Sequence, residues 1–372
     1  MTDRPACPRP VAGIDAIAPY LAGSSHGAGD GRTVKLSSNE GALGPSPAAI
    51  EAARKAAGDL TRYPDPHCEG LREAIGAAHG LDPARIVCGN GSDEILALLA
   101  QCYLAPGDEA IMAAHTFAVY DIAAKANGAV IRTVPDPNLR TRVEDLLAAV
   151  TSRTRILFLA NPNNPTGTYL TADEIRALHS GLPETVLLVL DGAYAEYVRG
   201  EDYSAGAALV EAYDNIVMTR TFSKMHALAA LRLGWAYASE PIAAVLNKVR
   251  APFNVNAVAQ AAGIAALADT AHQAAVLAHN ETWRPWLTQH LEGQGLSVVP
   301  SAANFVLARF PSAEAAQACN AALRARNILV RPTGSFGLPD ALRITVGPEE
   351  DLGSLMDALG ALLGPSADRL AV

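Results

Sequence analysis

Short runs of almost purely apolar residues alternate with stretches of helical periodicity through the first two thirds of this chain. The apolar runs are 110–113, 156–160, 186–190, 216–219 and 233–238. The helical stretches before and between them are 47–57, 68–78, 92–103, 120–126 and 172–180. A strand that is apolar on both faces is buried on both faces, which is typical of a parallel sheet between layers of helices. The alternation therefore predicts an α/β fold with a largely parallel sheet.

The 372 residues of the chain are expected to form about two domains, at roughly 150 residues per domain. Residues 1–45 are rich in proline, glycine and serine, and we expect them to form an N-terminal arm. Residues 46–255 carry most of the alternating pattern and form the predicted large domain. Residues 256–372 begin with an alanine-rich helical stretch and then mix strand-like and helical runs, which predicts a smaller α+β domain.

Composition narrows the function classes. The 29 Lys and Arg residues against 38 Asp and Glu residues give a net charge of −9, whereas nucleic-acid-binding proteins usually carry a basic excess. The five cysteines are scattered and form no Cys-x-x-Cys pair, which argues against a disulfide framework and against a zinc ribbon. We therefore expect no nucleic-acid partner and no metal site.

The sequence contains no convincing membrane segment. Residues 1–10 hold three prolines and several charges instead of an apolar signal sequence. The most apolar long stretch, 257–278, is rich in alanine and is interrupted by Gln260, Asp269, His272 and Gln273, so we interpret it as a buried helix. We expect a soluble, cytoplasmic protein without a membrane partner.

The first motif with a chemical meaning is Gly89-Asn90-Gly91-Ser92-Asp93-Glu94, which follows a strand-like run and opens a helix. Backbone N–H groups and the helix dipole favour an anion at such a turn. A dinucleotide site is the weaker interpretation, because Glu94 occupies the place of the third glycine. On this motif alone, an ordinary glycine turn that binds no ligand remains a possible interpretation.

The second motif is Ser223-Lys224 at the end of an apolar strand, with Arg232 eight residues after the lysine. Burial lowers the pKa of a lysine and frees its amine to form a Schiff base. Ser223 and Arg232 have the chemistry to hold a phosphate. The alternative interpretation is that Lys224 is an ordinary surface lysine that follows a strand.

Two further motifs follow apolar strands. Asp191 directly follows the apolar run 186–190, at the edge where open α/β sheets bind ligands. A buried carboxylate at this position requires a cationic partner such as a protonated ring nitrogen. The segment 161–167, Asn-Pro-Asn-Asn-Pro-Thr-Gly, places asparagine amides after another strand. A phosphate cradle, a Schiff-base lysine, a carboxylate and amide donors together match pyridoxal 5′-phosphate (PLP).

With these motifs the chain resembles the fold-type I PLP-dependent aminotransferases, and most of all the histidinol-phosphate aminotransferase family. The matching motifs run in family order from about Tyr20 to Gly347 and are 38–40, 62–65, 89–94, 161–167, 191–194, 223–224, 231–232, 301–305 and 342–347. The resemblance implies a large domain with a mostly parallel sheet of the seven-stranded type, sandwiched by helices, and a smaller C-terminal domain. It also implies transamination of histidinol phosphate with 2-oxoglutarate by a ping-pong cycle.

The resemblance assigns roles around the cofactor. Lys224 would form the Schiff base and shuttle a proton, and Asp191 would keep the pyridine nitrogen protonated. Asn164 and Tyr194 would bind the phenolate oxygen of the ring, and Phe117 would stack on the ring.

The same resemblance identifies the residues that would bind the cofactor phosphate and implies a homodimeric assembly. Ser92, Asp93, Ser223 and Arg232 would grip the cofactor phosphate. Tyr63 would reach the phosphate from a second subunit, which implies a homodimer with shared active sites.

For the substrates, the resemblance assigns Arg343 and Arg331 to the anionic group, since an arginine fork suits a phosphate or a carboxylate. Tyr20, Asn39 and Asn304 match residues that line the substrate site.

The sequence departs from the family pattern at Gly41-Ala42, at Gly192 and at His226, where bulky aromatics are common. We interpret His226 as an aromatic replacement and not as an acid or base. An aromatic amino-acid aminotransferase is the main alternative function, and a PLP-dependent decarboxylase is a weaker one. A sensor domain of a transcription regulator is disfavoured, because the 45-residue arm is too short for a DNA-binding domain.

Overall fold

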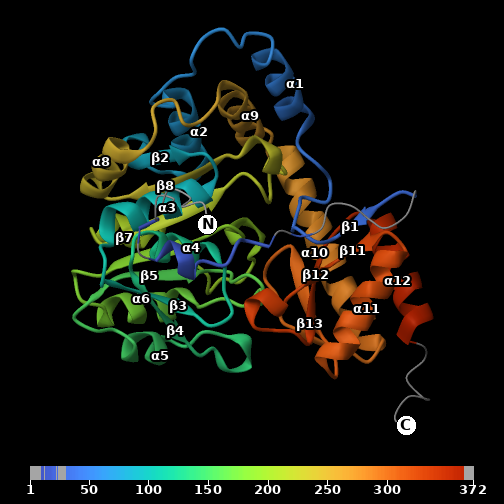
Figure 1. Cartoon of the computed structure of the whole chain (residues 1–372). Coiled ribbons are helices and arrows are strands. Elements are labelled where there is room, and N and C mark those ends of the chain that lie inside the picture. Colours follow the sequence, from blue (N-terminus) through green and yellow to red (C-terminus); the bar gives the residue numbers. More distant parts are fainter. Residues whose placement is uncertain (1–9, 12, 22, 24–30, 364–372) are drawn as a thin grey trace, which may run out of the picture.

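The computed structural model describes residues 10–11, 13–21, 23 and 31–363. The larger part of the molecule is built on a seven-stranded sheet with the order β2-β8-β7-β6-β5-β3-β4 (Figure 1). Its strands are β2 (Ile86–Gly89), β3 (Glu109–Ala113), β4 (Val130–Val134), β5 (Thr154–Ala160), β6 (Leu187–Asp191), β7 (Ile216–Thr221) and β8 (Gly234–Ala238). In this sheet β8 runs opposite to the other six strands, which share one direction. The predicted α/β fold with a largely parallel sheet is therefore confirmed.

Helices cover both faces of this sheet because the central strands are apolar on both faces. On β5, Leu157 and Leu159 belong to one core cluster, whereas Ile156 and Phe158 belong to the other. The first cluster is completed by α2 (Glu69–His79), α5 (Val143–Ala148), α6 (Ala172–Gly181), α7 (Ala207–Ala212) and α9 (Ala257–Ala268). The second is completed by α3 (Ser92–Tyr103), α4 (Val119–Ala126) and α8 (Glu240–Val249).

Local sequence signals set several helix ends. Ser46 accepts hydrogen bonds from two backbone amides at the start of α1 (Pro47–Ala56), and Pro47 occupies its first position. Thr171 and Glu174 form a capping box at the start of α6. These contacts fix where two predicted helices begin.

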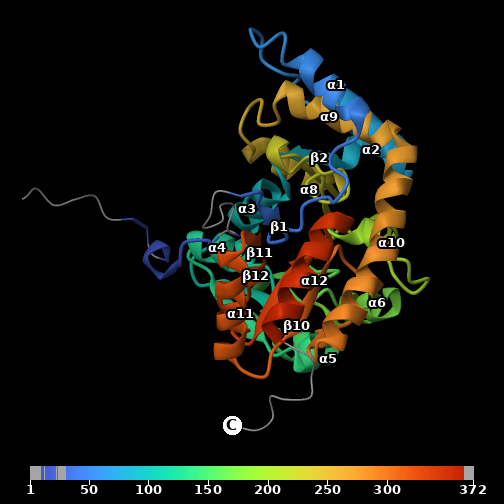
Figure 2. The same ribbon diagram turned by 90° about the vertical axis from the view of Figure 1, so that its right-hand side faces the viewer.

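The C-terminal part, drawn in orange and red in Figure 1, is built on an antiparallel sheet with the order β12-β13-β10-β9, together with three helices. Its elements are β9 (Ser297–Val299), β10 (Phe305–Arg309), β12 (Arg331–Pro332), β13 (Ala341–Thr345), α10 (Thr270–Gly293), α11 (Ala313–Ala325) and α12 (Glu349–Leu363). The long helix α10 runs along one side of the molecule (Figure 2).

The N-terminal segment joins the C-terminal part, since β1 (Val34–Lys35) pairs in parallel with β11 (Ile328–Leu329). Helix α9 instead packs against α1 and α2 of the larger part. The predicted bounds of the arm and of the two domains stay a prediction. None of the helices described is long and apolar enough to span a membrane.

The pairing brings four strand ends to one edge of the large sheet. β5, β6 and β7 are mutually parallel, and β2 runs in the same direction because β8 is antiparallel to both β2 and β7. Gly89, Thr221 and Gly234 are aligned across β2, β7 and β8. The polar motifs that follow β2, β5, β6 and β7 therefore lie at the same edge.

Candidate active site

A cavity of about 200 Å³ lies at this edge, between the large sheet, the C-terminal part and the N-terminal segment. Most of the residues that the sequence predicts for the site line it: Tyr20, Asn39, Ser92, Asp93, Phe117, Asn164, Asp191, Tyr194, Ser223, Lys224, Arg232, Arg331 and Arg343. Tyr63 and Asn304 are the predicted site residues that do not line it. The fold thus brings together residues as distant in the sequence as Tyr20 and Arg343.

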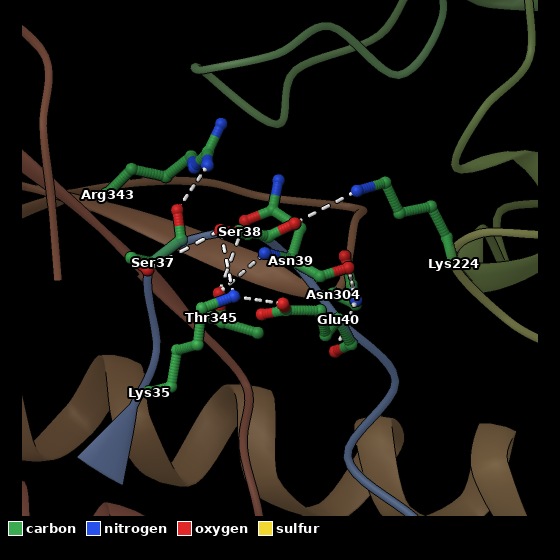
Figure 3. A network of polar contacts seen from close by, with 9 residues as sticks. All are labelled: Lys35, Ser37, Ser38, Asn39, Glu40, Lys224, Asn304, Arg343 and Thr345. Carbon is green, nitrogen blue, oxygen red and sulfur yellow. Dashed lines mark hydrogen bonds and ion pairs between the residues drawn. The ribbon is translucent and has the colours of Figure 1, made fainter. Parts of the chain in front are cut away.

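Lys224 extends into the cavity from the turn that follows β7. Its Nζ donates a hydrogen bond of 3.0 Å to the carbonyl oxygen of Ser38 in the N-terminal segment (Figure 3). Burial, helped by the nearby Arg343 and opposed by Glu40, lowers the pKa of Lys224 to about 8. The amine therefore changes its protonation state close to neutral pH.

Asp191 is the last residue of β6, and its side chain is buried. Its carboxylate accepts hydrogen bonds from Tyr120 at 2.7 Å, from Thr219 at 3.2 Å and from the Ala193 amide at 3.2 Å. Burial raises the pKa of Asp191 to about 6 despite these hydrogen bonds. A buried carboxylate with neutral donors alone is suited to a cationic ligand group.

Tyr194 lies between this carboxylate and the C-terminal part. Its hydroxyl accepts a hydrogen bond of 2.9 Å from the amide of Asn39, and its ring packs edge-on against Phe305. Burial raises the pKa of Tyr194 to about 12, so its hydroxyl stays protonated and available as a donor.

The glycine turn before α3 forms a cradle with cationic and hydroxyl groups around it. Gly91 has a φ of +83°, and no side chain caps the first amides of α3. A Cβ on Gly91 would come within 2.6 Å of the Arg232 guanidinium, so glycine permits the close approach. Arg232 also lies 3.4 Å from the Ser223 hydroxyl and 3.1 Å from Asp93. The arrangement fits an anion such as a phosphate.

Two arginines face the cavity from the C-terminal sheet. Arg331 and Arg343 are directly paired across β12 and β13. Arg343 is buried and donates hydrogen bonds to the Asn164 side chain at 2.5 Å and to the Ser37 carbonyl at 2.9 Å. Arg331 donates to the carbonyl of Leu21, next to Tyr20. Within the described chain, Nε of Arg343 is buried without an acceptor.

Tyr63 and Asn304 lie outside the cavity. Tyr63 is 81% exposed, and its ring stacks on Phe253 with a centroid distance of 4.6 Å. Asn304 is buried and donates to the backbone carbonyl of Asn39 at 3.1 Å. Asn304 therefore supports a cavity residue, and Tyr63 is free to contact another molecule.

The departures from the family pattern have structural explanations. His226 is buried beside Phe222, with ring centroids 4.9 Å apart, and does not line the cavity. A Cβ on Gly192 would lie 3.0 Å from the Arg220 side chain, and Arg220 forms an ion pair with Glu196. A Cβ on Gly41 would meet Ala227 at 2.7 Å, in the turn that carries Lys224.

Sequence reasoning missed Tyr120, Thr219 and Thr221. Tyr120 and Thr219 both donate to Asp191, and Thr221 donates to the Ser223 hydroxyl at 3.0 Å. The one usable signal is that Tyr120 lies only three positions after the predicted stacking residue Phe117, in the first turn of α4.

These residues fit PLP on observations of the structure itself. The cradle at Gly91 offers uncapped amides and a guanidinium for a phosphate, and the buried Asp191 lacks a cationic partner among the groups that bond its side chain. Lys224 lines the same cavity and has a lowered pKa. Among the described residues, no group of three or more His, Cys, Asp or Glu side chains is placed to hold a metal ion.

Comparisons with known proteins agree with this geometry. Two curated relatives are histidinol-phosphate aminotransferases. The one from Paramagnetospirillum magneticum is 55% identical over 96% of this chain and 99% of its own length. The one from Rhodospirillum centenum is 53% identical over 95% of this chain and 98% of its own length.

A solved structure agrees as well. The histidinol-phosphate aminotransferase from Sinorhizobium meliloti, in complex with pyridoxal 5′-phosphate, superimposes with a TM-score of 0.84 at 31% identity. The match covers 88% of this chain and 90% of that chain. A model of the family described as aminotransferase class I and II matches residues 32–359. The chain therefore belongs to the class I and II aminotransferase family.

Proposed function

We propose that this chain transfers the amino group of L-histidinol phosphate to 2-oxoglutarate, with PLP as its cofactor and by a ping-pong cycle. The observation that carries the proposal is a single cavity with two anion sites. Arg232 and the first residues of α3 after Gly91 line it, and so do the paired Arg331 and Arg343. Relatives of that name at 53% and 55% identity support the same substrate.

The residues that would hold PLP are those of the sequence-based assignment. Bound PLP supplies an electron sink that stabilises negative charge on the substrate carbon. Lys224 would hold it covalently, Asp191 would bind its ring nitrogen, and the Gly91 cradle with Ser223 and Arg232 would bind its phosphate. Asn164 and Tyr194 would bind the ring oxygen, and Phe117 would pack on the ring.

The chain's own groups have the properties that proton transfer requires. Nζ of Lys224 has a pKa of about 8, so it can take up a proton and release it again near neutral pH. Arg343 holds Asn164 in place through a hydrogen bond, and Asn39 holds the Tyr194 hydroxyl. The side chains of Asn164 and Tyr194 are therefore oriented before a ligand arrives.

The anionic ends of both substrates would bind at Arg331 and Arg343. The buried Nε of Arg343, which lacks an acceptor in the described chain, is a donor that an anion can use. Since phosphate and carboxylate both accept from a guanidinium fork, one site can serve the donor in one half-reaction and the acceptor in the other.

The assembly and the location are part of the same proposal. The exposed Tyr63 stacks on the partly exposed Phe253, and the apolar side chains of Leu60 and Ile264 are also exposed. A second copy that covers this surface would bring its own Tyr63 to the phosphate cradle. We propose a cytoplasmic homodimer with shared active sites.

The test is a ranking of amino donors with 2-oxoglutarate as acceptor. Histidinol phosphate should give a higher kcat/KM than phenylalanine, tyrosine or unphosphorylated histidinol. A higher kcat/KM for phenylalanine would overturn the proposal in favour of an aromatic amino-acid aminotransferase. Release of carbon dioxide from phenylalanine or tyrosine without formation of glutamate would indicate a decarboxylase.

A further inference from the structure

The segment of residues 35–40, here called the arm loop, lies between the C-terminal part and Lys224 (Figure 3). Backbone hydrogen bonds fix its beginning, because Leu36 donates to the Leu329 carbonyl at 2.7 Å and accepts from the Thr345 amide at 2.9 Å. The arm loop is therefore anchored on the C-terminal part before it reaches the cavity.

Two neighbouring carbonyl groups of the arm loop bind two functional cations. The Ser37 carbonyl accepts from Arg343 at 2.9 Å, and the Ser38 carbonyl accepts from Lys224 at 3.0 Å (Figure 3). The next residue, Asn39, has a φ of +56°, in the left-handed region. The conformation of the arm loop thus decides whether both carbonyls face their cations.

An ion pair joins the first and the last residue of the arm loop. Lys35 pairs with the carboxylate of Glu40, and its Nζ lies 3.3 Å from the Ser38 hydroxyl. The two side chains are 28% and 42% exposed, and an isolated surface pair of that kind contributes little to stability. Here, however, the pair joins the two ends of the segment whose carbonyls hold Arg343 and Lys224.

We propose that Lys35 and Glu40 are positioning residues, whose ion pair holds the arm loop so that the Ser38 carbonyl faces the amine of Lys224. The proposal deepens the proposed function and rests on it, since Lys224 is there the reacting lysine. Its test, however, follows the Lys224 amine itself.

The substitution Lys35→Met separates positioning from a simple charge effect. Removal of a nearby cation, by itself, leaves the pKa of Lys224 unchanged or raises it. Loss of the Ser38 acceptor lowers that pKa, because the hydrogen bond favours the charged amine. The charged groups that also act on Lys224, namely Arg343, Glu40, Asp93 and Arg232, are all retained in this variant.

The experiment uses the full-length, cofactor-free protein and trinitrobenzenesulfonate, which reacts with uncharged amines. Peptide mapping by mass spectrometry gives the labelling rate of Lys224 as a function of pH. In Lys35→Met the midpoint of this profile should lie at lower pH, whereas Glu40→Gln is not used for this test, because Glu40 also acts directly on the charge of Lys224. Labelling below the midpoint should rise about threefold for each half pH unit of displacement. Lys35→Arg should keep the wild-type midpoint.

The control is Lys125→Met, because Lys125 forms a similarly exposed pair with Asp121 on α4. A Lys35→Met midpoint at or above that of the wild type, with an unchanged Tm, would overturn the positioning role. Should Lys35→Met not fold, Lys35→Gln takes the same test. Failure here would leave the donor ranking untouched, so the two proposals fail separately.

Discussion

Tyr120 donates a hydrogen bond of 2.7 Å to Oδ2 of Asp191, and the tyrosine is completely buried. The ring of Tyr120 stacks on Phe158 of β5 and meets Phe117 edge-on. Helix α4 therefore fixes the carboxylate from one side, while Thr219 of β7 binds its other oxygen. The orientation of Asp191 is set by neighbours on two different elements.

Removal of this hydroxyl in Tyr120→Phe should affect catalysis more than folding. A hydrogen bond to a charged group contributes about 1.5–3 kcal/mol, so kcat/KM should fall about tenfold or more. The hydrogen bond of Tyr120 lowers the pKa of Asp191. Its loss raises that pKa, and the acid limb of the kcat/KM profile should move to higher pH.

The matched control is Tyr169→Phe, which removes a tyrosine hydroxyl bound to Asp202 at 2.9 Å on the surface. This variant should keep the wild-type pH profile. An unshifted acid limb in Tyr120→Phe would show that the hydrogen bond does not set the ionisation of Asp191.

Asp191→Asn should change how the stability of the cofactor-free protein depends on pH. The pKa of Asp191 rises from 3.8 to about 6 on folding, so the native state holds the proton more tightly than the unfolded state between these values. Wild-type stability should therefore fall, relative to Asp191→Asn, by roughly 3 kcal/mol as pH rises from about 4 to above 6.

Urea unfolding of both proteins at several pH values measures this difference. Parallel stability curves for wild type and Asp191→Asn across that range would exclude a raised pKa. With PLP added, the Asn variant should turn over several orders of magnitude more slowly.

Arg343→Ala should weaken both half-reactions. Charge-assisted hydrogen bonds contribute about 1.5–3 kcal/mol each, so kcat/KM should fall at least about tenfold for histidinol phosphate and for 2-oxoglutarate. Histidinol, which lacks the anion, should be a poor donor that is nearly indifferent to the substitution.

Arg309→Ala on the adjacent strand β10 is the control, because its side chain pairs with Asp340 outside the cavity. An equal loss for histidinol and histidinol phosphate in Arg343→Ala would mean that Arg343 acts through Asn164 and Ser37 instead of through the substrate anion.

Mixing two inactive variants should test the shared site. If Tyr63 acts in a second subunit, heterodimers of Tyr63→Ala and Lys224→Ala contain one intact site. Up to about half of the activity per heterodimer should return after subunit exchange. Demonstrated exchange without regained activity would place Tyr63 outside the site.

Sequence predicted those site residues that follow apolar strands. Asp191 is the last residue of β6, Lys224 and Asn164 come after β7 and β5, and parallel strands bring their carboxyl ends to one edge. Tyr120 and Thr219 escaped prediction because they look like ordinary members of an apolar helix face and an apolar strand. Their hydrogen bonds to Asp191 arise only from the packing of α4 and β7 around it.

Two features of the sheet also escaped the sequence pattern. β4 was not predicted, because it is an edge strand with Arg132, Thr133 and a half-exposed Val130. The antiparallel direction of β8 was also not predicted. A parallel pair needs a long crossover, and the connection from β7 to β8 holds only the short 3₁₀ turn Ala229–Leu231.

The assignment of Lys224 as the lysine that carries PLP has one direct test. Borohydride reduction of the PLP-loaded protein, followed by peptide mapping, fixes the cofactor on the lysine that holds it. The pyridoxyl group should be found on Lys224, and Lys224→Ala should bind PLP only non-covalently and lose transamination. A label on another lysine, such as Lys35 in the same network, would contradict the account of the site.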